Sequence, residues 1–251
     1  MRSLLFVPGD SARKLDKALH AGADAIIVDL EDSVAAAAKA EARRIAADFA
    51  GLHRERVAIY VRVNGLATGM TGEDLAAIMP AAPRGIMLPK AEGPQSAEQL
   101  SVMLRAEEAL GGLADGITRI LPIITETAAG LLMAPLWRTR QPRLAGLTWG
   151  AEDLSADIGA TSSRDDEGRL TDPFRLARSL TLFAAAACET DAIDTVHVAF
   201  NDLPALDTEC GQARRDGFTG KLAIHPAQVP VINAAFTPSG ADLAEARAVV
   251  S

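Results

Sequence analysis

The chain has 251 residues, of which 49% are hydrophobic and 23% charged, an ordinary globular composition with enough length to bury a sizeable core without disulfides or structural metals. Its formal net charge of −8 argues against nucleic acid and anionic membranes as partners. No stretch approaches the roughly 20 apolar residues of a membrane helix. The two cysteines, Cys188 and Cys210, match no zinc spacing and form no disulfide framework. We therefore expect a cytoplasmic protein in a reducing compartment.

Short apolar or β-branched segments alternate with longer helical patterns along the whole chain, which is typical of a parallel α/β fold. Strands are expected at Ser3–Val7, Ala25–Asp29, Val57–Arg62, Gly85–Leu88, Arg119–Ile123, Leu144–Trp149, Ile193–His197 and Lys221–Ile224. Helices are expected at Ser11–His20, Ala36–Phe49, Gly72–Met79, Ser96–Leu110, Ala128–Trp137, Pro173–Glu189, Asp202–Asp216 and Ala227–Ala235. No linker divides the chain. The pattern predicts a single-domain (β/α)8 TIM barrel over residues 1–251, with a short final helix at about 240–250.

The longest irregular segment, Ala160–Asp172, follows the sixth predicted strand and is rich in polar residues. A loop at this point can cover the C-terminal mouth of the barrel as a lid or a substrate loop. It can equally be a solvated excursion, and the two interpretations stay open.

Charged and strongly polar residues gather after the ends of the predicted strands and are scarce at their beginnings. They are Asp10, Asp29, Glu31, Asp32, Arg62, Asn64, Lys90, Glu92, Glu126, Glu152, Asp153 and His225. In TIM barrels the chemistry takes place at the C-terminal ends of the strands, and a purely structural barrel gives no reason for such one-sided placement. The pattern therefore indicates an active site at this end.

Two of these carboxylates, Glu126 and Asp153, follow the fifth and sixth strands. Neighbouring strands lie about 5 Å apart, so both side chains can reach one ion. No histidine or cysteine joins them in a ligand spacing. Oxygen ligands alone favour Mg2+ or Mn2+, with water and substrate in the remaining positions. The alternative is that each carboxylate pairs with a lysine or arginine, or caps the next helix.

The basic residues at the strand ends have several interpretations. Arg62 can bind a substrate carboxylate in a bidentate manner, pair with the acids at 29–32, or do both. Lys90 can be the Schiff-base lysine of an aldolase, although the acids near it favour a salt bridge. His225 can be a general base, but a loop-orienting role is favoured. His197, at the end of the seventh strand, is equally ambiguous.

Eight ordered segments carry a resemblance to a known family. They are RSLLFVPGD, DLEDSV followed by Lys39 and Ala42-Arg43, VRVNG, MLPKAE, ITET, WGAEDLSADIG, GFTGK and AIHPAQV. In this order they resemble the citrate lyase beta-subunit-like proteins of the HpcH/HpaI aldolase superfamily, from Arg2 to about Arg247. The resemblance implies a (β/α)8 barrel, usually trimeric, that uses Mg2+ and cleaves or forms 3-hydroxyacyl thioesters such as citryl-, malyl- or citramalyl-CoA.

The resemblance also implies roles for single residues. Glu126 in ITET and Asp153 in GAED match the metal ligands, Glu152 matches a residue of the keto-acid pocket, and Arg62 in VRVNG matches the arginine that binds the keto-acid carboxylate. Candidates of a second tier are Asp29, Glu31, Asp32, Asn64, Lys90 and His225. Relatives often extend into a C-terminal lid that can supply a catalytic aspartate. The sequence resembles the shorter members without it, which leaves the general acid and base unassigned.

The expected activity is that of a Mg2+-dependent carbon–carbon lyase, working as a homotrimer on an acyl-CoA and a 2-keto acid. A metal-dependent aldolase acting on free hydroxy-keto acids is one alternative, because it needs the same metal scheme. A non-catalytic barrel subunit of a carrier-protein complex is the other.

Overall fold

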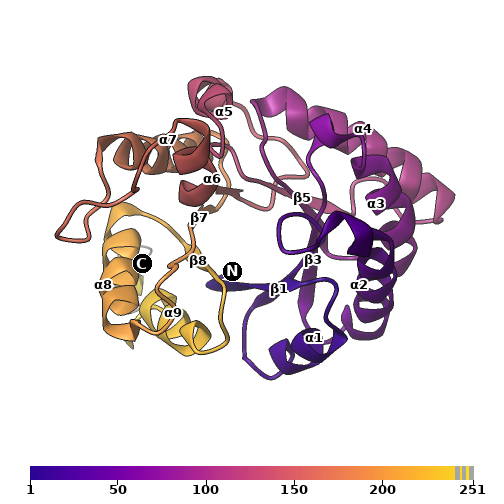
Figure 1. The fold of residues 1–251 in the computed structure, drawn as a ribbon, viewed down its shortest axis with the longest axis horizontal. Coiled ribbons are helices and arrows are strands. Elements are labelled where there is room, and N and C mark those ends of the chain that lie inside the picture. Colours follow the sequence, from indigo (N-terminus) through magenta and orange to yellow (C-terminus); the bar gives the residue numbers. More distant parts are fainter. Residues whose placement is uncertain (241–243, 245–246, 249–251) are drawn as a thin grey trace.

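The computed structural model describes residues 1–240, 244 and 247–248, and its strands form one parallel barrel. The strands are β1 (Ser3–Pro8), β2 (Ala25–Asp29), β3 (Ala58–Arg62), β4 (Gly85–Leu88), β5 (Arg119–Pro122), β6 (Leu147–Thr148), β7 (Ala192–Asp194) and β8 (Gly220–Ala223). Their order is β5-β4-β3-β2-β1-β8-β7-β6. Parallel bridges from Ile120 to Leu144 and from Ile123 to Thr148 close the ring between β5 and β6 (Figure 1). The predicted (β/α)8 barrel is confirmed.

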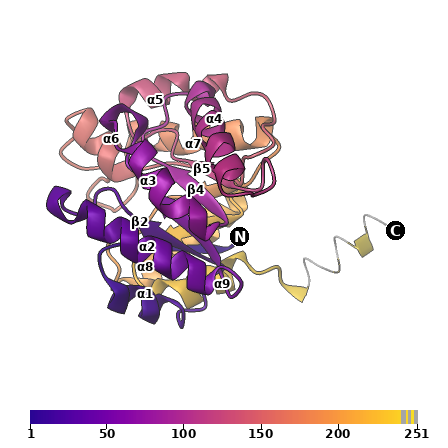
Figure 2. The same cartoon turned by 90° about the vertical axis from the view of Figure 1, so that its right-hand side faces the viewer.

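Helices surround the strands on the outside of the barrel (Figures 1 and 2). They are α1 (Ala12–Ala18), α2 (Lys39–His53), α3 (Thr71–Ile78), α4 (Pro94–Leu110), α5 (Ala128–Met133), α6 (Ala151–Asp157), α7 (Asp172–Ala187), α8 (Leu203–Asp216) and α9 (Gln228–Phe236). Single 3-10 turns lie at Ala36–Ala38, Leu66–Thr68, Met79–Ala81 and Ala134–Leu136. The sequence predicted no helix at α6, whose seven residues follow β6 after a gap of two residues.

The strand residues alternate between two apolar layers. In β2, Ala25 and Ile27 belong to a cluster built from the strands and their ends, which fills the barrel interior. Ile26 and Val28 belong to the larger cluster that includes residues of the surrounding helices. Because successive side chains of a strand point to opposite faces, a strand in this fold is buried on both sides. This explains why the strand segments of the sequence are nearly continuous runs of apolar residues.

Strands β6 and β7 fall furthest short of the predicted bounds, because backbone groups near their ends are bonded elsewhere. The N–H of Leu144 donates to the carbonyl of Gln141 in a turn, and β6 begins only at Leu147. The carbonyl of His197 accepts from the side chain of Gln228 at 2.8 Å, and β7 has already ended at Asp194.

The end of the chain is described only in part. Most of the helix predicted at about 240–250 lies outside the described residues. Within the described part of the chain, no helix is long and apolar enough to cross a membrane.

Candidate active site

A cavity of about 420 Å3 opens at the end of the barrel where the strand-end polar residues converge. Its charged lining consists of Asp29, Asp32, Arg62, Glu126, Glu152 and Asp153. The apolar part of the wall includes Phe6, Val7, Ile123, Trp149, Val196 and Leu222. A concave, largely apolar pocket with a few convergent charges is the usual form of a small-molecule site. The structure thus brings together the residues predicted after the second, third, fifth and sixth strands.

Asp29 and Arg62 form a bidentate pair on one side of this cavity. Nε and Nη2 of Arg62 donate to Oδ1 and Oδ2 of Asp29, both at 2.7 Å, and the two residues stand opposite each other in the register of β2 and β3. Asp29 also accepts the backbone N–H groups of Glu31 and Ser33. Burial raises the pKa of Asp29, but Arg62 and these N–H groups outweigh it, and the pKa is lowered overall. Asp29 therefore fixes the guanidinium as a charged partner.

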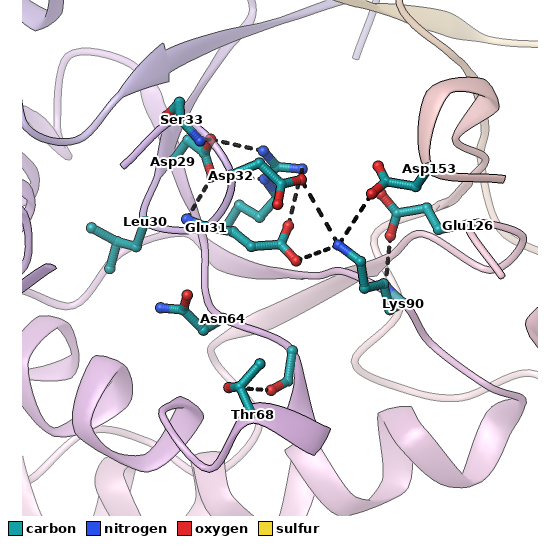
Figure 3. A network of polar contacts seen from close by, with 12 residues as sticks. Asp29, Leu30, Glu31, Asp32, Ser33, Asn64, Thr68, Lys90, Glu126 and Asp153 are labelled. Carbon is teal, nitrogen blue, oxygen red and sulfur yellow. Dashed lines mark hydrogen bonds and ion pairs between the residues drawn. The ribbon is translucent and has the colours of Figure 1, made fainter. Parts of the chain in front are cut away.

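Lys90 connects the acids at the centre of the site (Figure 3). Its Nζ lies 2.6 Å from Oε1 of Glu31, 3.3 Å from Oδ1 of Asp153 and 3.8 Å from Oδ2 of Asp32. Its backbone has a φ of 49°, a left-handed conformation uncommon for a residue other than glycine. In this conformation the backbone N–H donates to Oε2 of Glu126 at 2.6 Å. Lys90 thus contacts the site with both its main chain and its side chain.

The carboxyl groups of Glu31 and Glu126 have raised pKa values. Glu126 is 2% exposed, and burial, with added repulsion from Asp153 and Glu31, raises its pKa to about 8. Burial raises the pKa of Glu31 against the opposing effects of Arg62 and Lys90. A buried acid with a perturbed pKa in a cavity is a candidate functional group.

The pKa of Lys90 itself is also raised. Burial lowers it, but the charges of Glu31, Glu126 and Asp153 outweigh burial and hold the group in its ammonium form. The same balance raises the pKa of Arg62, where burial is outweighed by Asp29 and Glu31. Both cations are therefore fixed charges at neutral pH.

The donor set around Glu126 and Asp153 fits a hard divalent cation. The two carboxylates come from the adjacent ends of β5 and β6, and Asp153 lies in the first turn of α6. The pKa of Glu126 is raised because Arg62 and the N–H of Lys90 do not offset its burial. A bound divalent ion would supply the missing positive charge. Within residues 1–240, 244 and 247–248, no group of three or more His, Cys, Asp and Glu side chains forms a metal site. The pair would therefore supply two ligands, with water or substrate supplying the others.

Asn64 is buried just after β3 and supports the loops that carry the site. Lys39, on α2, donates to the carbonyls of Leu30 at 2.6 Å and Glu31 at 2.7 Å, and to Oδ1 of Asn64 at 2.7 Å. Oδ2 of Asp74 accepts from both the backbone N–H and the side-chain amide of Asn64. The sequence suggested no such function for Lys39, because strand-end placement cannot single out a residue at the start of a helix.

The two histidines after β7 and β8 lie away from the lining of this cavity. His225 is exposed, stacks on Phe200 with ring centroids 4.9 Å apart, and accepts the N–H of Ala227 at its Nδ1. This is a loop-orienting contact. His197 is buried, with its Nδ1 3.1 Å from Glu209.

The loop at Ala160–Asp172 lines a different cavity from the one at the barrel mouth. A second hollow, of about 710 Å3, is lined by residues of α7, α8, β7 and β8 and by loop residues that include Arg164 and Glu167. No residue between 160 and 172 is among those lining the first cavity. Arg164 is instead tied to Glu209 of α8 at 2.7 Å. In this conformation the loop lines the second hollow, which shares Trp149 and Thr195 with the cavity at the barrel mouth.

The fold and the site define a barrel with a carboxylate-rich, cation-binding centre at the C-terminal ends of its strands, and comparison with known proteins gives its family. Residues 2–226 match the family model of HpcH/HpaI aldolase/citrate lyase. The chain is 37% identical over 250 residues to a (3S)-malyl-CoA thioesterase of Cereibacter sphaeroides, covering 96% of this chain and 79% of the relative. It is 34% identical over 253 residues to the mitochondrial citramalyl-CoA lyase of Rattus norvegicus, covering 95% and 72%.

Solved structures give the same result. Protein CitE from Mycobacterium tuberculosis, in complex with magnesium, acetoacetate and coenzyme A, matches with a TM-score of 0.81 and 36% identity, over 99% of this chain and 85% of that one. The chain belongs to the HpcH/HpaI aldolase/citrate lyase family. The family resemblance of the sequence segments is thereby confirmed.

Proposed function

We propose that the protein is a Mg2+-dependent carbon–carbon lyase. It cleaves a 3-hydroxyacyl-CoA, such as citramalyl-, malyl- or citryl-CoA, into an acyl-CoA and a 2-keto acid, or joins the two. The observation that carries this proposal is the convergence of Glu126 and Asp153 with Arg62 in one cavity at the barrel mouth. Relatives named for malyl-CoA and citramalyl-CoA, and a structure with magnesium and coenzyme A, support the substrate class and the cofactor.

Each residue of the site has a proposed task in this reaction. Glu126 and Asp153 would hold Mg2+ or Mn2+, which when bound supplies a Lewis acid that polarises an oxygen of the keto-acid half. Arg62 lines the cavity as a charged group held in place by Asp29, and it would bind the carboxylate of that half. Glu152, in the first turn of α6, lines the same pocket.

Lys90 and Asn64 balance charge and orient the site rather than react. Lys90 offsets the charge of the clustered carboxylates through its contacts with Glu31 and Asp153. Asn64 holds the ends of β2 and β3 through Lys39 and Asp74. None of these tasks requires a covalent intermediate.

We also propose that the protein is a cytoplasmic homotrimer. Leu176 and Phe183 lie seven residues apart on one face of α7 and are 53% and 67% exposed. Such an apolar stripe supports a subunit contact. Cys188 and Cys210 are both buried free thiols, in keeping with a reducing compartment. Sedimentation equilibrium should give three times the mass of one chain, and a monomer at micromolar concentration would contradict the assembly.

The activity is tested by mixing the protein with Mg2+ and a panel of 3-hydroxyacyl-CoA thioesters and following keto-acid release. EDTA should stop the release. Turnover of free hydroxy-keto acids alone would instead identify an aldolase. Thermal unfolding gives an independent measurement, because a specific ligand raises the melting temperature by mass action. Stabilisation by a carrier protein, without turnover of any substrate, would identify a non-catalytic subunit.

A further inference from the structure

The proposed reaction needs a group that moves a proton, and the inference here rests on that proposed function. When the bond between the two halves breaks, the 3-hydroxyl group loses its proton and becomes the carbonyl of the keto acid. The electron pair of the broken bond forms the enolate of the thioester, which takes up a proton on carbon. One proton leaves oxygen and one arrives on carbon, so a single carboxylate can carry it through both steps.

Four of the five carboxylates that line the cavity are unsuited to this task. Asp29 accepts two hydrogen bonds from Arg62 and two from backbone N–H groups, so its oxygens are already in use. Glu126 and Asp153 form the proposed cation site. Glu152 is the neighbour of Asp153 in the first turn of α6, and its proposed task is to line the keto-acid pocket.

Asp32 is the remaining carboxylate, and its surroundings differ from those of the others. Its side chain lines the cavity and is 53% exposed. Its Oδ2 lies 3.6 Å from Nη1 of Arg62 and 3.8 Å from Nζ of Lys90, both longer than a hydrogen bond. Within the part of the chain that the structure describes, no hydrogen bond reaches the Asp32 carboxylate. Both of its oxygens are therefore free to accept a proton from a bound molecule.

The position of Asp32 relative to the rest of the site is the second observation. Asp32 and Asp153 lie on opposite sides of the Lys90 ammonium (Figure 3). On its other side Asp32 has Arg62, the proposed partner of the substrate carboxylate. Asp32 thus borders the space between the carboxylate-binding group and the cation-binding group, where the bond that breaks must lie.

We propose that Asp32 is the catalytic residue that removes the hydroxyl proton in the cleavage direction and returns it to the enolate carbon. In the reverse direction it takes a proton from the acyl-CoA carbon and delivers it to the alkoxide oxygen. Because it is held near two fixed cations without being hydrogen-bonded to either, it can approach both reacting atoms by a small side-chain rotation.

The test compares Asp32→Asn and Asp32→Ala with the wild type and with Asp166→Asn. Asp166 is an exposed carboxylate in the loop at 160–172 and lines neither cavity, so it controls for the loss of one negative charge. Both Asp32 variants should lose about 10²–10⁴-fold in kcat, the usual contribution of a general acid or base. Formate should restore part of the activity of Asp32→Ala and have no effect on Asp32→Asn or Asp166→Asn. Mg2+ affinity and the melting temperature should stay at the wild-type values in all three.

The outcomes separate this inference from the function on which it rests. If the wild type releases no keto acid from any thioester, the proposed function fails and the role of Asp32 fails with it. If the wild type is active and Asp32→Asn stays within about threefold of it, Asp32 is not the proton carrier, although the enzyme is still a lyase. A loss of activity in Asp32→Ala that formate does not reverse, or one accompanied by loss of Mg2+ binding, would show that the residue only shapes the site.

Discussion

Gly150 approaches Glu126 so closely that a Cβ atom at position 150 would lie 2.6 Å from Cγ and 3.2 Å from Oε1 of that glutamate. The backbone of Gly150 has φ −124° and ψ 120°, which any residue adopts. Glycine is therefore required here because a side chain would collide with Glu126, and not because of the backbone conformation. The residue at the start of α6 sets the position of a carboxylate that comes from the end of β5.

Replacing Gly150 by alanine should displace Glu126 and weaken cation binding. Changes that reorient a metal ligand typically cost 10–100-fold in metal affinity, and we expect Gly150→Ala to lower Mg2+ affinity by about tenfold or more. Titration calorimetry measures this directly. Gly211→Ala is a matched control, because its new Cβ would meet nothing closer than 3.6 Å. Equal affinities in the two variants would show that Glu126 tolerates the added methyl group.

The pKa of about 8 for Glu126 predicts a pH dependence of both stability and metal binding. An unfolded glutamate has a pKa of 4.5, so between these values the folded state binds the additional proton. The free energy of unfolding of the metal-free protein should therefore fall as pH rises from about 4.5 to 8. Mg2+ requires the ionised carboxylate, so its affinity should rise by up to about tenfold per pH unit and level off above pH 8.

Glu126→Gln is the control for this pH dependence. The variant should lose Mg2+ binding, and its unfolding free energy should no longer decline across the same pH window. Urea unfolding at several pH values, with and without Mg2+, measures both effects. A decline of equal size in Glu126→Gln would assign the titration to another group.

The barrel and the convergence of the site residues could be predicted from the sequence, and both predictions depend on the same property of parallel barrels. Parallel strands all end on the same face of a closed barrel, so Asp29, Arg62, Glu126 and Asp153 had to converge once the strands were recognised. Strand ends were less predictable, as the turn at Leu144 shows, because they depend on which group bonds each N–H or carbonyl.

Other features depend on contacts that no pattern in the chain contains. The contact of Gly150 with Glu126 joins residues 24 positions apart, and the three hydrogen bonds of Lys39 go to groups on two other segments. The loop at 160–172 is tied to α8 by the salt bridge from Arg164 to Glu209, a contact between residues 45 positions apart. These features require the packed structure.

Arg62→Lys should weaken keto-acid binding while leaving coenzyme A binding unchanged. Lysine cannot make the two parallel hydrogen bonds to Asp29, so the remaining charge is no longer held in a fixed position. A lost charge-assisted hydrogen bond costs about 2 kcal/mol, or roughly 30-fold in affinity. Calorimetric titration with pyruvate, oxaloacetate or glyoxylate and, separately, with coenzyme A gives the comparison. Weakening of both ligands by the same factor would assign Arg62 to another role.

The protonation state of Lys90 distinguishes two enzyme mechanisms, because a Schiff-base aldolase needs a neutral lysine. Here Glu31, Glu126 and Asp153 outweigh the effect of burial and raise the pKa of Lys90, so it stays an ammonium ion throughout the neutral range. An ammonium group has no lone pair with which to attack a keto acid. Borohydride added together with pyruvate or oxaloacetate should therefore leave the mass of the protein unchanged. A reduced adduct on Lys90, located by peptide mass spectrometry, would overturn the metal-dependent mechanism.

A pair of substitutions tests the electrostatic role of the same residue. Lys90→Arg keeps the positive charge between Glu31 and Asp153 but cannot form an imine, whereas Lys90→Met removes the charge at a similar side-chain length. If Lys90 acts through its charge, the arginine variant should retain most of the kcat. The methionine variant should lose about tenfold or more in kcat, because an uncompensated buried acid near a reacting group costs about 1.4 kcal/mol or more. If Lys90 were the nucleophile, both variants would be equally inactive, and that result would rule out a purely electrostatic role for Lys90.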